Sequence, residues 1–367
     1  MWWNVTHYAP LCANKKMSLE LMSHSSTAMT EKPTYIYIAG RGHSGSTLLT
    51  LLLARHPRVV AVGELANLPL QVARDETTKW VGRCSCGERP MDCPMWGDVL
   101  RRVEGSTGTD FLANPFSWRI SDIGMEEEYR SQAPVRAPWV WFRNRLWRVL
   151  RYAQYYAPQW LRPVLGFYRP QRRWGENRSR LAAEIADVNA VDAIVDASKD
   201  PLDMLDVYQN ATIPVKVILL TRDARGNIWS MIKKIKPGEP RKGPVTRASH
   251  DWVKVNRRIW HLARQVPEAD CLHVRYEDIC RDPESTMRKL FEFLGLEPHD
   301  VVGSQADEDG ASDQGHTIGG NKIRFTSEKL NISEDFRWRE NLTEDDLAIV
   351  RDIAGPMSDA LGHEIEN

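Results

Sequence analysis

The stretch TYIYIAGRGHSGSTLLTLLLARHP, residues 34–57, decides the fold of this chain. Thr34 to Ile38 is a run of apolar, β-branched and aromatic residues, which is typical of a buried strand. A glycine-rich loop follows, and the leucines between Ser46 and Arg55 favour a helix. A strand, a glycine-rich loop and a helix start together present free backbone N–H groups at the positive end of the helix dipole. The stretch therefore predicts a site for a phosphate or a closely related anion.

The loop lacks the lysine that is typical of loops that bind nucleotide triphosphates. Gly40 and Gly45 have the spacing of the nucleotide-triphosphate loop, but Ser46 follows where that loop carries a lysine. The lysine normally reaches the β- and γ-phosphates, so its absence argues against an ATPase or a kinase. A phosphate-loop small-molecule kinase is kept as an alternative function, because it would share the fold.

A second short strand, Val59 to Val62, ends at Gly63 and Glu64. Ligands of parallel α/β sheets bind beyond the carboxyl ends of the strands. Glu64 is therefore expected beside the anion loop, where a carboxylate within hydrogen-bond reach can accept a proton from a substrate. The alternative is that Glu64 caps a backbone segment or pairs with an arginine.

Two further strand–turn–helix units follow. In the first, Ala193 to Val195 is the predicted strand and Lys199 lies in the turn before the next helix. In the second, Val215 to Leu220 is the strand and Arg222 lies at its end. Ser230 comes eight residues after Arg222, slightly more than two helical turns, so both side chains can face one ligand.

These segments together resemble the bacterial type of sulfotransferases that use PAPS (3′-phosphoadenosine 5′-phosphosulfate). His-Ser-Gly-Ser-Thr at residues 43–47 is similar to the family's 5′-phosphosulfate loop, although His43 stands where the family carries Lys or Arg, and Arg41 lies two residues earlier. Leu-Thr-Arg-Asp-x-Arg at residues 220–225, followed by Ser230, resembles the 3′-phosphate motif.

Three other segments extend the resemblance. The run through Gly63-Glu64 looks like that of tyrosylprotein sulfotransferases, in which the glutamate is the catalytic base. Ser-Lys-Asp-Pro at residues 198–201 resembles the segment whose lysine contacts the bridging oxygen next to the sulfuryl group. His316 to Phe325 resembles the late glycine-rich cofactor loop with its basic residues.

The resemblance implies an α/β, three-layer, P-loop-like fold with a central parallel sheet and a mainly helical Trp/Arg-rich insertion. We expect a flexible leader at residues 1–32 and a single sulfotransferase domain at 33–367, with the insertion at about 66–190. The expected reaction is in-line transfer of a sulfuryl group from PAPS to a hydroxyl or amine, without a metal. Glu64 is the expected base, while His43 (if protonated) and Lys199 stabilise the leaving oxygen. The expected cofactor-binding residues are Arg41, Gly42, His43, Ser44, Gly45, Ser46, Thr47, Arg222, Ser230, Asn321, Lys322 and Arg324.

Three of the six cysteines, Cys84, Cys86 and Cys93, lie close together in the sequence. A zinc site needs four ligands, usually with two residues between paired cysteines, but here one residue separates the first pair and no fourth ligand is evident. A disulfide would be out of place in a reducing cytosol. We expect reduced structural thiols and no metal.

The insertion contains a basic and aromatic segment. Between Arg136 and Arg180 there are eleven arginines, one acidic residue and no lysine, interleaved with tryptophans at 139, 141, 147, 160 and 174. Phe142, Leu146 and Val149 follow helical spacing. The interpretations left open are a helix whose apolar side packs on the core, a lid or groove for an acceptor, and contact with an anionic membrane. The last also supports the alternative of a non-enzymatic membrane-surface or partner-binding protein.

The remaining expectations come from overall composition. The formal net charge is zero, which gives no field to attract nucleic acid. We find neither a convincing secretory signal nor a run long enough to cross a bilayer, and we therefore expect a cytoplasmic enzyme. The acceptor is expected to be a small molecule, a glycan or a lipid, and peptide tyrosine is a further candidate. The sequence does not indicate an oligomeric state.

Overall fold

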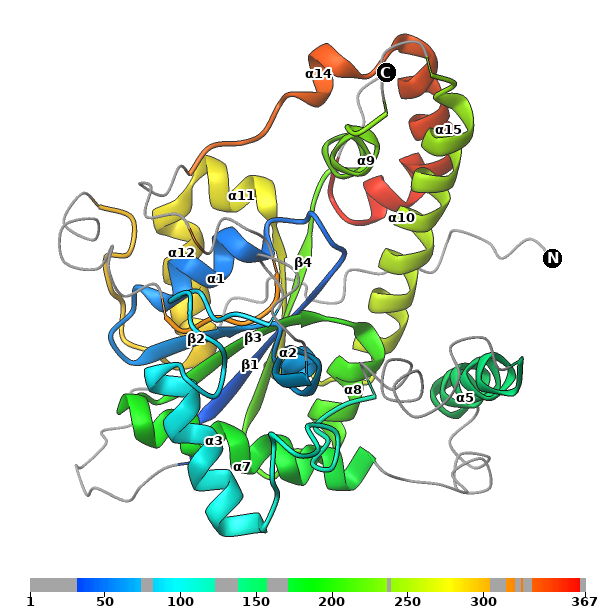
Figure 1. The fold of residues 1–367 in the computed structure, drawn as a ribbon. Coiled ribbons are helices and arrows are strands. Elements are labelled where there is room, and N and C mark those ends of the chain that lie inside the picture. Colours follow the sequence, from blue (N-terminus) through cyan, green and yellow to red (C-terminus); the bar gives the residue numbers. More distant parts are fainter. Residues whose placement is uncertain are drawn as a thin grey trace.

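A computed structural model describes residues 32–73, 82–122, 138–156, 171–235, 239–303, 315–320, 325 and 332–363. Five parallel strands form one sheet in the order β2-β3-β1-β4-β5 (Figure 1). The strands are β1 (Thr34–Gly40), β2 (Val59–Gly63), β3 (Ala193–Lys199), β4 (Val215–Thr221) and β5 (Cys271–Arg275). All four strands predicted from the sequence are present, and the sheet contains β5 in addition.

The helices alternate with the strands. They are α1 (Ser46–Ala54), α2 (Leu68–Ala73), α3 (Pro94–Thr107), α5 (Pro138–Tyr156), α7 (Gln171–Asn189), α8 (Pro201–Asn210), α9 (Ala224–Ile232), α10 (Lys242–Ala263), α11 (Tyr276–Arg281), α12 (Pro283–Leu294), α14 (Trp338–Asn341) and α15 (Glu344–Ala360), with short 3-10 turns at η2 (Leu65–Asn67) and η3 (Glu268–Asp270). None of the described helices combines the length and the apolar character needed to span a bilayer.

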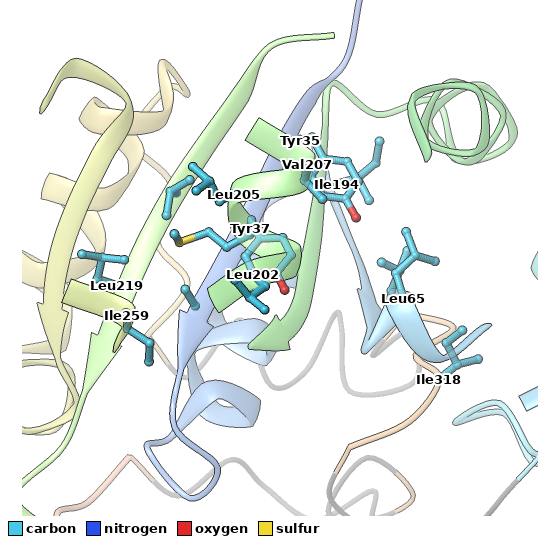
Figure 2. Close-up of a cluster of buried hydrophobic side chains, with 14 of the residues drawn as sticks. Tyr35, Tyr37, Leu65, Ile194, Leu202, Leu205, Val207, Leu219, Ile259 and Ile318 are labelled. Carbon is cyan, nitrogen blue, oxygen red and sulfur yellow. The ribbon is translucent and has the colours of Figure 1, made fainter. Parts of the chain in front are cut away.

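The two faces of β1 build two separate cores. Tyr35 and Tyr37 face one side of the sheet, where they join residues of α8 and α10 (Figure 2). Residues of α3 and α7 belong to the same core. Ile36 and Ile38 face the other side, against α1 and α12. Alternate residues of a strand point to opposite faces, so a strand buried on both sides needs an unbroken apolar run. This arrangement is the three-layer, P-loop-like α/β fold that the sequence predicts.

A buried ionic network holds the α8 side of the sheet. The Arg178 guanidinium of α7 donates to both carboxylate oxygens of Asp203, at 2.9 and 3.2 Å. Tyr37 Oη donates to Asp203 at 3.0 Å, and Tyr35 Oη donates to Asp196 at 2.6 Å. Buried charges are tolerated when they are paired and hydrogen-bonded, so these contacts fix the register of α7 and α8 against β1 and β3.

The parallel strands bring the predicted site to one edge. The loop after β1, Glu64 after β2, Lys199 at the end of β3 and Arg222 after β4 all follow carboxyl ends of neighbouring strands. Asp200 fixes the turn beyond Lys199, because its carboxylate accepts the Leu202 and Asp203 N–H groups at 2.9 Å and caps α8.

Candidate active site

The loop between β1 and α1 is held from behind by α9. Asn227 Nδ2 donates to the Gly42 carbonyl at 3.0 Å and to Ser44 Oγ at 3.2 Å. Arg41 is buried, and its guanidinium pairs with Asn227 and with Asp251 of α10, the latter at 2.6 Å. Arg41 therefore braces the loop against α9 and α10, and His43 is the more exposed of the two basic loop residues.

The first turn of α1 is shaped for close approach of a ligand. Gly45 has φ 86°, and a Cβ at this position would lie 2.4 Å from the Tyr276 ring, so only glycine fits. No described side chain caps the N-terminus of α1, which leaves its N–H groups directed at the cleft. One cleft is lined by this turn together with Glu64, Lys199 and the late glycine segment: Ser46, Thr47, Thr50, Leu51, Gly63, Glu64, Ala197, Lys199, Thr317, Gly319 and Gly320.

Glu64 is fixed through the backbone on both sides. Its own N–H donates to the Ile318 carbonyl at 2.7 Å. The next two N–H groups, of Leu65 and Ala66, donate to Asp196 Oδ1 at 3.1 Å and to Ser198 Oγ at 3.0 Å. Strand β3 thus positions the carboxylate that follows β2.

Both oxygens of the Glu64 carboxylate have a partner. Lys199 Nζ forms an ion pair with Oε1, and Asn67 Nδ2 donates to Oε2 at 2.9 Å. The two charged side chains are about one-fifth exposed, so a ligand in the cleft can reach them. The pair places an acceptor for a proton beside a cation that can stabilise developing negative charge.

Strained backbone occurs at two of the predicted catalytic residues. Among the described residues, non-glycine backbone with positive φ is found at His43 (69°), Lys199 (69°) and Ala190 (52°). A left-handed conformation costs an L-residue about 1 kcal/mol or more and persists where the surroundings impose it. The fold therefore holds the His43 and Lys199 side chains in directions that ordinary strand or helix geometry would not give.

The His43 imidazole lies among cations. Burial lowers its pKa, and the neighbouring charges of Lys233, Arg41, Arg222 and Lys199 lower it further. His43 is therefore neutral near pH 7 in the free protein, whereas the sequence analysis assigned it a role when protonated. An anion bound among these cations would offset them and favour the imidazolium.

Arg222 is buried behind the loop. It donates to the His43 carbonyl at 3.1 Å, lies 4.6 Å from the centroid of the Tyr276 ring, and has Asp335 at 3.4 Å. Ser230 lies on α9, and its hydroxyl donates to the Gly226 carbonyl at 3.0 Å. A Cβ at Gly226 would lie 3.1 Å from Arg222 Nε, so the glycine leaves room for the Arg222 guanidinium against α9.

A chain of hydrogen bonds supports the strand ends beside Arg222. Thr221 Oγ1 lies 2.8 Å from His273 Nε2 and 2.9 Å from His363 Nε2. His363 Nδ1 lies 3.3 Å from Glu277, which in turn accepts the Asp223 N–H at 2.9 Å. Burial, assisted by the charges of His363 and Arg275, lowers the pKa of His273 to about 4.

The remaining predicted cofactor residues, Asn321, Lys322 and Arg324, lie outside the described residues. The segment just before them is described and packs against Glu64. Ile318 forms a parallel bridge with Gly63, and a Cβ at Gly319 would lie 3.0 Å from the Glu64 Cβ.

Four contact residues were missed by the sequence analysis: Asn67, Asn227, Tyr276 and Asp335. Asn67 is three residues after Glu64, and Asn227 lies one helical turn after Asp223, so helical spacing was an available signal for both. Tyr276 follows β5, whose carboxyl end meets the others at the same sheet edge. For Asp335 no sequence signal was available.

Residues 116–300 match the sequence profile described as "Sulfotransferase family". The chain belongs to this family. The matched residues include β3, β4, β5 and the segments between them. Lys199, Arg222 and Ser230 therefore lie within the match.

Curated relatives of this family member include protein-tyrosine sulfotransferases. Protein-tyrosine sulfotransferase 1 of Danio rerio is 34% identical over 116 residues, which are 29% of this chain and 30% of the relative. Protein-tyrosine sulfotransferase A of Caenorhabditis elegans is 27% identical over 181 residues, 46% of this chain and 44% of the relative. The match thus spans less than half the length of either relative.

Solved structures with a similar fold include the sulfotransferase domain from the curacin biosynthetic pathway. It aligns over 92% of this chain and 100% of its own length, with 16% identity and a TM-score of 0.46. Sulfotransferase STF9 from Mycobacterium avium aligns over 90% and 77%, with 13% identity and a TM-score of 0.42. Similarity at this level does not indicate which residues form the site.

The basic aromatic segment forms the expected helix, α5, and of the three interpretations left open, the exposure of its apolar residues contradicts the one in which its apolar side packs on the core. Phe142 and Val149 are 62% and 57% exposed, and α5 lies at the margin of the molecule (Figure 1). Among the α5 side chains that the structure describes, Arg151 is the buried one, and its guanidinium pairs with Asp122 and with Asp206 of α8. This buried ion pair decides which side of α5 faces inward. The other two interpretations of the segment stay hypotheses.

Proposed function

We propose that this sulfotransferase transfers a sulfuryl group from PAPS to a hydroxyl or amine of an acceptor, with Glu64 as the general base. The observation that carries the proposal is the shared cleft: the uncapped start of α1, the Glu64 carboxylate and the Lys199 ammonium line one opening. An anion site beside a carboxylate and a cation is what transfer of an anionic group to a protonated nucleophile requires.

The site fits a nucleotide with anionic groups at two places. One is the start of α1, where Gly45 lets the backbone approach a ligand and no side chain in the described part of the chain caps the N–H groups. The other is the Arg222 guanidinium, which is buried and has a planar fork that matches a phosphate. We assign the 5′-phosphosulfate to the first place and the 3′-phosphate to Arg222 and Ser230. Asn321, Lys322 and Arg324 complete this proposed set on sequence grounds.

PAPS, when bound, supplies the sulfuryl group and an adenosine bisphosphate leaving group. Glu64 removes the proton from the acceptor, and its fixed backbone sets the direction from which the acceptor approaches. Lys199 and the N–H groups of Ser46 and Thr47 stabilise negative charge at the leaving side. His43 contributes to the same stabilisation in its protonated form.

The Glu64–Lys199 ion pair gives Lys199 two alternative partners. In the free protein it neutralises Glu64. An anion at the start of α1 would compete for the ammonium group, and loss of the pair would leave the Glu64 carboxylate free to accept a proton. We infer that donor binding thereby activates the base, since the same ammonium cannot serve both partners fully.

The acceptor is proposed only as a class. A small molecule, glycan or lipid with a reactive hydroxyl or amine stays our prediction. The names of the curated relatives specify protein tyrosine, so a tyrosine-containing peptide belongs in the same test. No described residue identifies one of these classes.

The proposal is tested by ligand-induced stabilisation followed by transfer. A ligand that binds only the native state adds about 2.7 kcal/mol to the free energy of unfolding at a concentration 100 times Kd, and it therefore raises the melting temperature. We expect PAP (adenosine 3′,5′-bisphosphate) and PAPS to stabilise the protein, and ADP or ATP with Mg²⁺ to do so much less. Radiolabelled PAPS and a panel of phenol, sugar, lipid and tyrosine-peptide acceptors then test transfer. Stabilisation by ATP with Mg²⁺ and not by PAP would support the kinase alternative instead.

A further inference from the structure

Four potential metal ligands converge next to the late glycine segment. Cys84, Cys86, Cys93 and His316 each offer one ligand atom, and these four atoms lie within 4.8 Å of one another. His316 is the fourth partner that the cysteine spacing alone did not reveal, because more than two hundred residues separate it from Cys93. We propose that these residues bind one structural zinc ion, which fastens the segment carrying His316 to the helix α3 region.

The geometry favours a single tetrahedral ion. Cys93 Sγ lies 3.1 Å from His316 Nδ1, and Cys84 Sγ lies 3.6 Å from the same nitrogen. Ligand atoms around a tetrahedral zinc stand about 3.5–3.8 Å apart, since Zn–S is about 2.3 Å and Zn–N about 2.0–2.1 Å. The Cys84–His316 separation lies in this range, and the Cys93–His316 pair would open slightly when the ion binds. Three sulfurs and one imidazole nitrogen are a zinc ligand set, and their closeness leaves room for one ion and not for an iron–sulfur cluster.

Backbone hydrogen bonds form a tight turn around the cysteine sulfurs. The Gly87 N–H donates to the Cys84 carbonyl at 2.9 Å, and the Cys84 N–H donates to the Glu88 carbonyl at 2.8 Å, which closes a tight turn around Cys86. Gly87 has φ 92°, a conformation suited to glycine. Cys93 caps α3, and its sulfur accepts the Trp96 N–H at 3.5 Å. These contacts hold the sulfurs together in advance of any ion.

The proposed ion would connect two segments that already pair around it. The Ser85 N–H donates to the Thr317 carbonyl at 2.9 Å, and the Thr317 N–H donates to Ser85 Oγ at 3.0 Å. Trp96 Nε1 donates to the His316 carbonyl. The carbonyl of Ile318, the residue after Thr317, accepts the Glu64 N–H at 2.7 Å. Zinc is therefore assigned a positioning role: it holds the segment whose Ile318 carbonyl accepts the Glu64 N–H, and it does not touch the reacting atoms.

The first test is metal content, measured without nucleotide or acceptor, so its outcome is independent of the proposed function. Untagged full-length protein, purified from zinc-supplemented cells under reducing conditions, is analysed by inductively coupled plasma mass spectrometry. We expect about one zinc per chain, the stoichiometry of a closed four-ligand site. Zinc at background level in this protein would overturn the proposal. So would an intact-mass measurement showing a disulfide from Cys93 to Cys84 or Cys86 in the purified protein.

Variants test the ligand set. Cys86→Ser removes the exposed ligand and leaves the buried ones, so the protein should fold while losing most of its zinc, and His316→Gln should behave alike. Cys280→Ser is the matched control, because Cys280 is a free cysteine on α11, outside the cluster, and should retain zinc. Equal zinc content in all three variants would overturn the assignment.

The positioning role has its own readout. Removal of zinc with a high-affinity chelator should lower the melting temperature of the wild-type protein by several degrees, because metal binding contributes to folding free energy. It should also accelerate hydrogen exchange at the Glu64 N–H, the group that donates to Ile318. Unchanged melting and unchanged exchange at Glu64 after proven zinc loss would overturn the link to the base.

Discussion

Lys199 and Glu64 form an ion pair across the carboxyl ends of β3 and β2, inside the cleft that the start of α1 also lines. The pair joins the candidate base to the candidate cation of the leaving side. It also explains why Lys199 is kept at φ 69°, since the left-handed backbone turns its side chain towards Glu64 instead of continuing the strand.

Replacement of Glu64 by Gln should separate catalysis from binding. The amide is nearly isosteric, can still accept from Asn67 and no longer competes with the anion for the Lys199 ammonium, so the Kd for PAP, measured by calorimetry, should rise by no more than about threefold over wild type. The amide is not a base, and turnover should fall by about 10²–10⁴-fold, the usual contribution of general base catalysis. Turnover is measured as PAP release in the presence of an active acceptor. A variant that retains turnover would exclude the base role.

Two substitutions at Lys199 distinguish the charge from the backbone strain. Lys199→Met removes the ammonium and keeps a side chain at positive φ, whereas Lys199→Gly removes both the ammonium and the strain. Both should lose turnover by a similar factor. In urea unfolding Lys199→Gly should be more stable than Lys199→Met by about 1 kcal/mol, the cost of holding an L-residue in the left-handed region. If Lys199→Gly were active, the ammonium would have no role in the reaction.

Arg222 should contribute to nucleotide affinity. Arg222→Ala removes a charge-assisted contact worth about 1.5–3 kcal/mol, so PAP should bind about 10- to 150-fold more weakly. Ser230→Ala should weaken binding less, because a neutral hydroxyl contributes about 1 kcal/mol. Arg247→Ala, an exposed arginine on α10, is the control of equal charge change and should bind like wild type. Adenosine 5′-phosphosulfate, which lacks the 3′-phosphate, should bind Arg222→Ala and wild type alike, and a large difference would contradict the assignment.

The sheet and its site edge could be predicted because their signals are local. The apolar run after Thr34, the glycines before Ser46 and the Asp200-Pro201 helix start are contiguous in sequence, and the structure contains the corresponding strands, helices and cap. Strand lengths were underestimated: β3 continues through Ser198 to Lys199, since pairing with β1 extends it past the last apolar residue.

The contacts that depend on distant segments could not be predicted. The Arg41 side chain is turned away from the cleft by Asp251, which is remote in sequence, and the cysteine cluster obtains His316 from the late glycine segment. The orientation of α5 follows from the burial of Arg151 between two carboxylates, although an arginine would be assigned to the solvent side by hydrophobic pattern. Periodicity carries no information about such pairs, because they require the tertiary fold.

His43 should take up protons when PAP binds. Its pKa is lowered in the free protein by burial and by the cations around it, and a bound anion offsets those cations. Calorimetry at pH 6.5 in buffers of different ionisation enthalpy should show greater proton uptake for wild type than for His43→Asn. Asparagine is the suitable replacement, because it tolerates positive φ and does not titrate. Equal proton uptake in both proteins would show that His43 does not sense the ligand.

The buried imidazole of His273 should make stability depend on pH. Its pKa is about 4 in the folded protein and about 6.5 in the unfolded chain, so the unfolded state binds more protons between these values. Stability is therefore complete above pH 6.5 and is lost as the pH falls from 6.5 to 4. The loss from this group is at most about 3.4 kcal/mol, at 1.36 kcal/mol per pKa unit.

Urea unfolding of wild type and His273→Gln between pH 7.5 and pH 4 isolates this contribution. The glutamine amide can keep a hydrogen bond to Thr221 without titrating, so the variant should be less stable near neutral pH through imperfect packing but should lose less stability on acidification. The two curves should therefore converge as the pH falls. His250→Gln, at an exposed histidine of α10, is the control and should parallel wild type. Parallel curves for His273→Gln and wild type would mean that His273 is protonated in the folded state without cost, and that the hydrogen bonds at Thr221 do not depend on a neutral imidazole.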